Sequence, residues 1–348
     1  MVCLGYKQSQ GDHTLFFKHS QGGKLTVLLV YIDDIIITGE DLTERQLLKE
    51  KLSKKFEMKD LGQLKYFLGI EVAYSQQGIF ISQRKYVLDL LQETGKLGCK
   101  PTSVPIEQNH RISFEEESAK VDKGQYQRLV GKLIYLAHTR PDLAYAVSVV
   151  SQFMHDPRVR HMEVVNRILQ YLKATPGRGI LFKRGGSLTM EAYTDVDYAG
   201  SLTDRRSTTC YCTFLCGNLV TWRSKKQSVV ARSSAEAEFR AMALGICELL
   251  WMKQVLEDLK IQCEGPMKLF CDNKSAISIA HNPVQHDRTK HIEIDRHFIK
   301  EKLDSKLITT AYIPSGHQLA DVLTKGLPTE RFSQLTCKPG MIDIHSPA

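Results

Sequence analysis

EAYTDVDYAG, at residues 191–200, decides the fold of this chain. Alternate residues of an extended strand share a face, so this stretch predicts a strand with Tyr193 and Asp195 on one face and a break at Gly200. A carboxylate would then be held on rigid backbone near the end of a sheet. Asp197 lies on the same face and is the alternative to Asp195 for that position.

Three later segments each bring one more acid. SSAEAEF opens a predicted helix carrying Glu238, LFCDNKSA is a short apolar strand that delivers Asp272 into the next helix, and SGHQLADVLTK places Asp321 early in another helix. Four carboxylates on separate elements repel one another, and bound divalent cations are the usual compensation. The pattern therefore predicts a two-metal site for phosphodiester hydrolysis.

Each acid at the start of a predicted helix could instead have a local structural role. In SSAE, Ser233 can cap the helix with Glu236 as its reciprocal partner, which gives Glu236 a backbone task and leaves Glu238 for the site. Asp272 could be a plain helix cap, and Asp321 a plain aspartate at a helix start.

Length and charge limit the classes of protein to which this chain can belong. The 348 residues are enough for two or three domains with sizeable cores. Residues 1–185 hold 27 Lys and Arg against 20 Asp and Glu, which gives +7 of the formal charge of +8, while residues 186–330 are close to neutral. A basic half beside a half rich in carboxylates suits a polyanionic partner such as nucleic acid.

Cysteine usage and hydropathy indicate the compartment. Nine cysteines, an odd number at irregular spacings, indicate a reducing environment. Cys210, Cys212 and Cys216 lie on a predicted strand, where buried apolar side chains are favoured over a zinc site. No apolar run reaches the ~20 residues needed to span a bilayer, and the amino terminus lacks the pattern of a secretion signal. We therefore expect an intracellular protein, cytoplasmic or nuclear, that is neither secreted nor inserted in a membrane.

A second pair of acids occurs early in the chain. KLTVLLVYIDDIIITG, at residues 24–39, has two apolar, β-branched runs around Asp33 and Asp34 and predicts a hairpin with both acids at its tip. Burying two unpaired acids costs several kcal/mol, which argues against a core position. A metal-binding tip is therefore favoured over a simple turn, which aspartate also suits.

The tetrapeptide YIDD, at residues 31–34, resembles the YxDD motif of reverse transcriptases. The sequence that follows resembles the Pol polyprotein of copia-type LTR retrotransposons, and this resemblance covers practically the whole chain. The segments that carry the resemblance through palm, thumb and connection are FEMKDLGQLKYFLGIEV, GIFISQRKYVLDLL, HTRPDLAYAVSVVSQFM and RILQYLKATPG. The resemblance implies that Tyr31, Asp33 and Asp34 are the polymerase motif, in which the two aspartates help to hold catalytic metals.

The resemblance also implies a division into segments. These are a partial reverse transcriptase palm with the start of the thumb at 1–95, a helical thumb or connection at 96–185, a ribonuclease H-like domain at 186–330 and a tail at 331–348. TPGRGILFKRGGS, at residues 175–187, is interpreted as a linker or hairpin bend before the last domain. The fold class expected is α/β (α+β), with truncated palm hairpins and a helical thumb or connection before a mixed sheet flanked by helices.

One departure from the family bears on polymerisation. The family's fingers and an earlier palm aspartate should precede the hairpin by many residues, yet only thirty residues lie ahead of Tyr31. We therefore expect no primer extension by this chain alone, unless a separate upstream Pol fragment supplies the missing parts.

The resemblance assigns Asp195, Glu238, Asp272 and Asp321 as the catalytic acids of a ribonuclease H. They would hold two Mg²⁺ ions, with Mn²⁺ as an alternative, and cut the RNA strand of an RNA–DNA hybrid. A primer–template duplex is the partner implied for the polymerase part. His317, four residues before Asp321, is a doubtful counterpart of a histidine that assists product release in many cellular ribonucleases H.

The competing hypothesis is a catalytically silent, nucleic-acid-binding relic of a retrotransposon. In that case the basic half binds a duplex and the four acids are vestigial. Cys210 stands where the family commonly has glycine before the tyrosine, and this exchange would disturb the packing of the second strand of the last domain.

Overall fold

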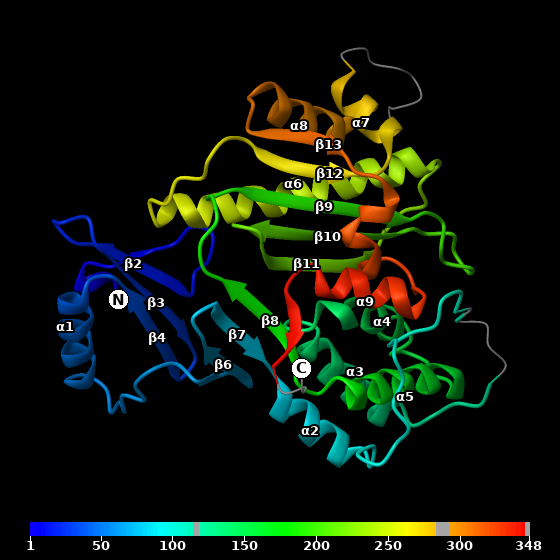
Figure 1. Ribbon diagram of the computed structural model, residues 1–348, viewed down its shortest axis with the longest axis horizontal. Helices are drawn as coiled ribbons and strands as arrows, with labels where there is room; N and C mark the ends of the chain where they lie inside the picture. Colours follow the sequence, from blue (N-terminus) through cyan, green and yellow to red (C-terminus); the bar gives the residue numbers. More distant parts are fainter. Residues whose placement is uncertain (111, 114–117, 283–292, 345–348) are drawn as a thin grey trace. The chain divides into compact units, whose positions relative to one another are not determined.

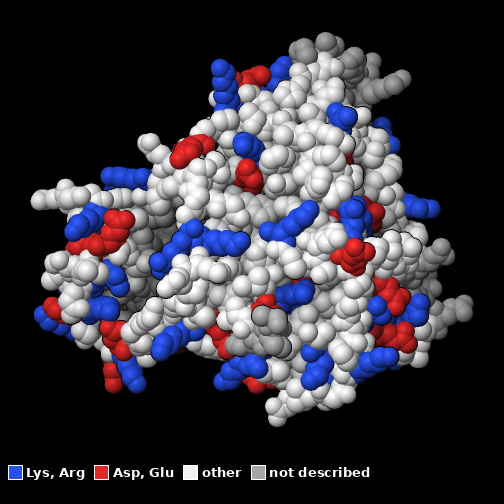
Figure 2. All heavy atoms as spheres, viewed as in Figure 1, with Lys and Arg blue, Asp and Glu red and all other residues white. Residues whose placement is uncertain are grey.

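The computed structural model describes residues 1–110, 112–113, 118–282 and 293–344 (Figure 1). The chain divides into two compact units. The first comprises Met1–Leu68 and Glu248–Cys263, and the second comprises Gly69–Cys247 and Glu264–Ala348. In Figure 2, Lys and Arg are interspersed with Asp and Glu over the visible face.

The first unit contains a four-stranded antiparallel sheet in the order β1-β2-β3-β4. Helix α1 starts after Asp41, whose side chain accepts a hydrogen bond of 2.9 Å from the backbone N–H of Glu44. Its buried Leu48 and Leu52 pack with Leu28 of the sheet to form a small core. The elements are η1 Val2–Leu4, β1 Lys7–Gln8, β2 Leu15–His19, β3 Leu25–Tyr31, β4 Asp34–Gly39, α1 Leu42–Ser53 and β5 Tyr66–Phe67.

The second unit contains two sheets and most of the helices. In the first of these sheets β14, β8, β7 and β6 are antiparallel neighbours in that order. Four helices pack into one apolar core beside it. The elements are β6 Ile70–Tyr74, β7 Gly78–Ser82, α2 Arg84–Glu93, α3 Lys123–Leu136, α4 Pro141–Ser151, α5 Val159–Ala174, β8 Arg178–Lys183 and β14 Met341–Asp343.

A buried ion pair joins the start of α4 to the end of α5. Arg140 donates two hydrogen bonds, of 2.9 and 2.7 Å, to the carboxylate of Asp142, and a third of 2.9 Å to the backbone oxygen of Thr175. The hydroxyl of Tyr171 donates to the same carboxylate at 2.6 Å. A charge with this many partners can be buried without the penalty of an unpaired ion.

The second sheet of this unit has the order β11-β10-β9-β12-β13. Strands β9, β10 and β11 are antiparallel, whereas β12 and β13 run parallel to β9. The elements are β9 Met190–Asp197, β10 Thr208–Leu215, β11 Asn218–Lys226, α6 Ser234–Asp258, β12 Met267–Cys271, α7 Lys274–His281, α8 Glu293–Asp304, β13 Ile308–Tyr312, η3 Ser315–His317, η4 Leu319–Leu323 and α9 Thr329–Cys337. The residues of α6 from Glu248 onward belong to the first unit.

Successive side chains of β9 point to opposite faces of the sheet and therefore contact two different layers of the fold. Val196 packs against Ala237 and Ala241 of α6. The other face carries Tyr193, which packs on the apolar core shared with α4, η4 and β10. Asp195 has the same parity as Tyr193 and so faces away from α6.

The mixed α/β class and the mixed sheet flanked by helices are confirmed. One local prediction is wrong. The stretch 175–187 contains β8 rather than a linker, because Ile180 and Leu181 are buried when the strand pairs between β7 and β14. Asp321 lies in the first turn of a helix, as predicted, and that helix is the short 3-10 helix η4.

The four-segment division remains a prediction, and residues after 328 form α9 and β14. Cys210 and Cys212 are buried on β10, as expected, and Cys216 is half-buried. Among the helices that the structure describes, none has the length and apolar character that crossing a bilayer requires.

Candidate functional site

Asp195 lies near the end of β9, the central strand of the mixed sheet, and its side chain is buried. The hydroxyl of Thr324 donates a hydrogen bond of 2.5 Å to its Oδ2. Burial raises the pKa of Asp195 to about 7; the charge of Lys325 opposes this rise, and the charges of Asp321 and Asp272 add to it. Several acids therefore act on one another at this position.

Asp272 reaches the same place because β12 is parallel to β9. Cys271 pairs with Thr194, so the residues that follow each of them are also neighbours. Asp272 is not the cap of the next helix, since the side chain of Asn273 accepts the capping hydrogen bond from Ala276. Instead, Oδ2 of Asp272 accepts a hydrogen bond of 2.8 Å from the hydroxyl of Ser315.

The two glutamates near the start of α6, Glu236 and Glu238, have different roles. The backbone N–H of Glu236 donates to the hydroxyl of Ser233 at 3.2 Å, and the Glu236 carboxylate accepts from the backbone N–H of Arg232 at 2.7 Å. Glu236 therefore has the local task predicted for it, with Arg232 as the backbone donor.

Glu238 is buried beside the other acids. Its Oε2 lies 3.9 Å from Sγ of Cys271, and one ligand atom from each of Glu238, Cys271 and Asp272 lies within 4.8 Å of the others. Burial, together with the charges of Asp195 and Asp272, raises the pKa of Glu238 to about 9. The carboxyl is therefore protonated at neutral pH unless a cation binds beside it.

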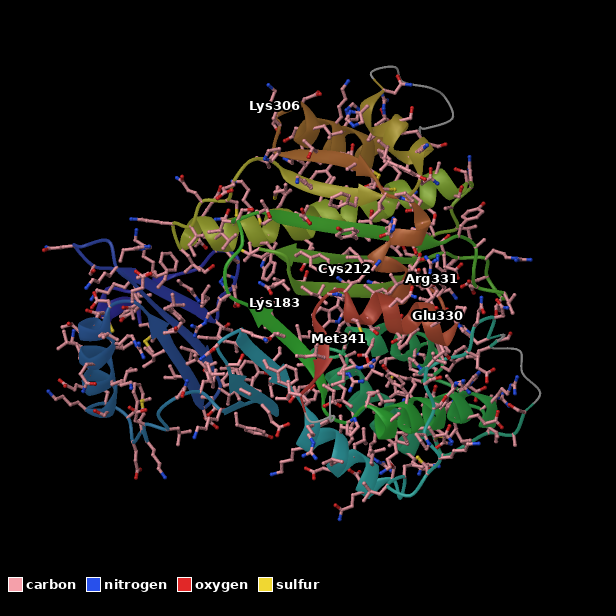
Figure 3. All side chains as sticks on the ribbon, viewed as in Figure 1. Lys183, Cys212, Lys306, Glu330, Arg331 and Met341 are labelled. Atoms are coloured by element: carbon pink, nitrogen blue, oxygen red, sulfur yellow. The ribbon has the colours of Figure 1, made fainter. Side chains whose placement is uncertain are left out.

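Asp321 enters the cluster from η4 and is also buried. Nζ of Lys325 lies 2.7 Å from Oδ1 of Asp321 and 3.6 Å from Oδ2 of Asp195. The guanidinium of Arg331 pairs with Oδ2 of Asp321. Arg331 comes from α9 and is labelled in Figure 3.

Charge interactions link the four predicted acids, which come from β9, α6, the end of β12 and η4: Asp321 and Asp272 act on Asp195, and Asp195 and Asp272 act on Glu238. Among the described residues, the potential ligand atoms that lie within 4.8 Å of one another are those of Glu238, Cys271 and Asp272, without Asp195 or Asp321. Sequence reasoning missed the residues that touch the four acids, which are Ser315, Thr324, Lys325, Arg331 and Cys271. For Lys325 a signal was available, because its spacing of four from Asp321 brings the two side chains together on a helical turn.

The alternatives to these residues lie at the edge of the cluster. Asp197 is half-buried, and its carboxylate occupies the space beside Gly200, where a Cβ would meet Oδ2 at 1.9 Å. A side chain at residue 200 would therefore displace this carboxylate. His317 is exposed on η3, two residues after the Ser315 that bonds Asp272. Cys210 pairs with Asp195 across the sheet and places its Sγ 3.2 Å from the backbone oxygen of Ala320, so β10 accommodates it.

The polymerase motif lies in the first unit. Tyr31 and Asp34 pair at the ends of β3 and β4, and Ile32 takes the left-handed conformation at φ 50°. The predicted hairpin is confirmed, with Asp33 in its turn and both aspartates exposed. Within the described ranges, neither aspartate belongs to a group of three close potential metal ligands. Metal binding at this tip remains a prediction.

The donor set of the second unit fits a divalent metal ion. Mg²⁺ prefers carboxylate oxygens and leaves coordination positions for water and phosphate. The four acids are anchored on separate elements, and ordinary burial would penalise their charges. A bound cation would offset this penalty, as Lys325 and Arg331 do in part.

Comparison with known proteins places the chain in a family. A family model described as reverse transcriptase (RNA-dependent DNA polymerase) matches residues 1–108. The chain is 40% identical over 344 residues to the retrovirus-related Pol polyprotein from transposon RE1 of Arabidopsis thaliana, covering 99% of this chain and 23% of that protein. It is 35% identical to the corresponding polyprotein from transposon TNT 1-94 of Nicotiana tabacum, covering 99% of this chain and 26% of that protein.

The chain therefore spans about a quarter of the length of these polyproteins. A shorter relative, an uncharacterized mitochondrial protein of Arabidopsis thaliana, is 42% identical over 64% of this chain and 93% of its own length. A solved RNase H domain from Mycobacterium tuberculosis covers 43% of this chain and 97% of its own, with 10% identity and a TM-score of 0.29, values that assign nothing to this chain. From the sequence relatives it follows that the chain belongs to the family of Pol polyproteins of copia-type retrotransposons.

Proposed function

We propose that the second unit is a metal-dependent nuclease that cuts the RNA strand of RNA–DNA hybrids, as a ribonuclease H does. The observation that supports it is the meeting of Asp195, Glu238, Asp272 and Asp321 at one end of a mixed sheet. Carboxylates gathered in this way are the ligands of two-metal phosphodiester hydrolysis. Membership of the Pol family adds nucleic acid as the class of substrate.

In this proposal the four acids would hold two Mg²⁺ ions, or Mn²⁺ ions in their place. When bound, such ions activate the attacking water and stabilise the leaving 3′-oxygen. The chain's own residues orient the ligands: Thr324 fixes one oxygen of Asp195, and Ser315 fixes one oxygen of Asp272. The apolar layers on both sides of β9 exclude bulk water from the buried acids.

The first unit would contribute a polymerase palm, with Asp33 and Asp34 as part of its metal site and a primer–template duplex as partner. The boundaries proposed for the parts remain 1–95, 96–185, 186–330 and 331–348.

The test is cleavage of a labelled RNA–DNA hybrid by the purified chain in Mg²⁺. Wild type should cut only the RNA strand, and EDTA should stop the reaction. Asp272→Asn should lose nearly all activity, typically several orders of magnitude where a metal ligand is removed. Asp197→Asn is the matched control, because it removes a neighbouring carboxylate outside the proposed ligand set.

Equal rates for wild type and Asp272→Asn would exclude the assignment. If no variant cuts but the chain binds the hybrid with a steep salt dependence, the silent nucleic-acid-binding protein is the correct interpretation. Circular dichroism and thermal unfolding of each variant would separate loss of chemistry from loss of folding.

A further inference from the structure

Lys325 places a positive charge between two buried carboxylates that come from different elements. Its Nζ lies 2.7 Å from Oδ1 of Asp321 and 3.6 Å from Oδ2 of Asp195. The carboxylate side chains are only 2–3% exposed, whereas the lysine side chain is 39% exposed. The ammonium group therefore lies beside two buried carboxylates, although more than a third of the lysine side chain is exposed to solvent. Lys325 can withdraw by rotating its own side chain, with no change in the sheet.

The position of this ammonium conflicts with a metal ion on the same oxygens. A Mg²⁺ ion binds carboxylate oxygens at about 2.0–2.1 Å and demands near-octahedral geometry. Oδ1 of Asp321 and Oδ2 of Asp195 cannot meet that demand while an ammonium group occupies the space between them. Two positive charges at such a short distance also repel each other strongly where bulk water does not screen them.

Arg331 differs from Lys325 in its geometry. Its guanidinium pairs with the other oxygen of Asp321 and also donates to the backbone oxygen of Ser315 at 2.5 Å. It anchors one acid to a neighbouring backbone group rather than bridging two acids. It leaves the space between β9 and η4 to Lys325.

We propose that Lys325 is a displaceable counter-cation of the acid cluster, which holds Asp195 and Asp321 together in the absence of metal and withdraws when a divalent ion binds. This inference rests on the proposed function, because it takes the two aspartates to be metal ligands. It adds a competition, because a metal ion that binds to the oxygens of Asp195 and Asp321 must first displace the ammonium group of Lys325. The affinity of the site is therefore lower than that of the same carboxylates without the lysine.

The first test uses the wild-type chain and reads the lysine itself. An amine-acetylating reagent is applied with and without saturating Mg²⁺, and modification of each lysine is quantified by peptide mass spectrometry. Acetylation of Lys325 should rise severalfold when Mg²⁺ is present. Lys268 is the internal reference, because it is exposed on β12 and its nearest acid is Glu191 at 3.9 Å. Unchanged or reduced acetylation of Lys325 in Mg²⁺ would overturn the proposal.

The second test measures metal affinity in the absence of substrate. Mn²⁺ is titrated into wild type, Lys325→Met and the control Lys268→Met, with binding followed by electron paramagnetic resonance. Loss of the competing charge should tighten binding by about tenfold in Lys325→Met, on the scale of one screened charge pair. The control should match wild type. A folded Lys325→Met chain that binds Mn²⁺ no more tightly than wild type would contradict the competition.

These readouts separate the inference from the nuclease proposal, because neither requires catalysis. Metal-linked release of Lys325 in a chain that never cuts a hybrid would support the counter-cation and reject the nuclease. Normal hybrid cleavage with Lys325 protected throughout would do the reverse.

Discussion

The carboxyl of Asp195 is buried, accepts a hydrogen bond from Thr324, and lies in the field of two acids, Asp321 and Asp272, and of Lys325. Its pKa near 7 and that of Glu238 near 9 are well above the ordinary range of about 4 for these side chains. The folded, metal-free chain therefore binds protons that the unfolded chain has already released at these pH values.

This difference predicts how stability depends on pH. Between about pH 5 and pH 9 the folded state binds more protons than the unfolded state, so the free energy of unfolding must fall as pH rises. In EDTA we expect the free energy of unfolding to fall by several kcal/mol across this window, since each pKa unit corresponds to about 1.4 kcal/mol. Urea unfolding at pH 5 and at pH 8 measures this difference in the free energy of unfolding.

Asp195→Asn is the control for this dependence, because it removes one of the two carboxyls and should lose a large part of the slope. Saturating Mg²⁺ should also weaken the slope, since ligand binding stabilises the folded state more at higher pH. A wild-type chain whose stability in EDTA is constant or rises over the window would contradict the assignment.

At the scale of single residues, the sequence revealed the four acids but not their partners. The acids follow local signals, such as the capping of α6 by Ser233 that sets Glu236 apart from Glu238. Ser315 and Arg331 reach Asp272 and Asp321 from η3 and α9. No periodicity within one segment encodes such contacts, because they depend on how separate loops pack.

At the scale of elements, the packing of α6 on the mixed sheet depends on a glycine. A Cβ at Gly245 would lie 2.6 Å from Cγ2 of Thr194 on β9 and 3.3 Å from Cδ1 of Leu269 on β12. The helix can approach the sheet closely only because this position has no side chain.

Gly245→Ala should therefore destabilise the chain by about 1–3 kcal/mol through overpacking, although alanine is the better helix former. Gly131→Ala is the matched control, because Gly131 is exposed within α3 and a Cβ there would meet nothing within 4 Å. That change should stabilise by about 0.5–1 kcal/mol. Urea unfolding of both variants decides the point, and equal effects of the two changes would contradict this account of α6.

Elements with a regular pattern were predictable from the sequence, and irregular ones were not. The strand β9, the strand that carries Cys210 and Cys212, and the hairpin of β3 and β4 were predicted correctly. Strand β8 was missed because Pro176 and its neighbouring glycines resemble a linker, and its partners β7 and β14 are distant in sequence.

At the scale of the whole molecule, the net charge of +8 predicts salt-sensitive binding of a polyanion. In EDTA, the affinity for a fluorescent RNA–DNA hybrid should fall at least about tenfold between 50 and 200 mM salt, because Lys and Arg release counterions from phosphates. Fluorescence anisotropy measures the affinity, and sucrose at matched osmolality is the control. Binding that is insensitive to salt would show that phosphate contacts do not dominate.

The pairing of β14 with β8 has a consequence for synthesis on the ribosome. Met341 lies opposite Ile180, and the mixed sheet with its helices is encoded between the two strands. The edge of β8 that pairs with β14 therefore stays unpaired until nearly all of the intervening chain has been translated. An exposed strand edge invites wrong partners, so a nascent chain stalled before residue 341 should be especially prone to aggregate.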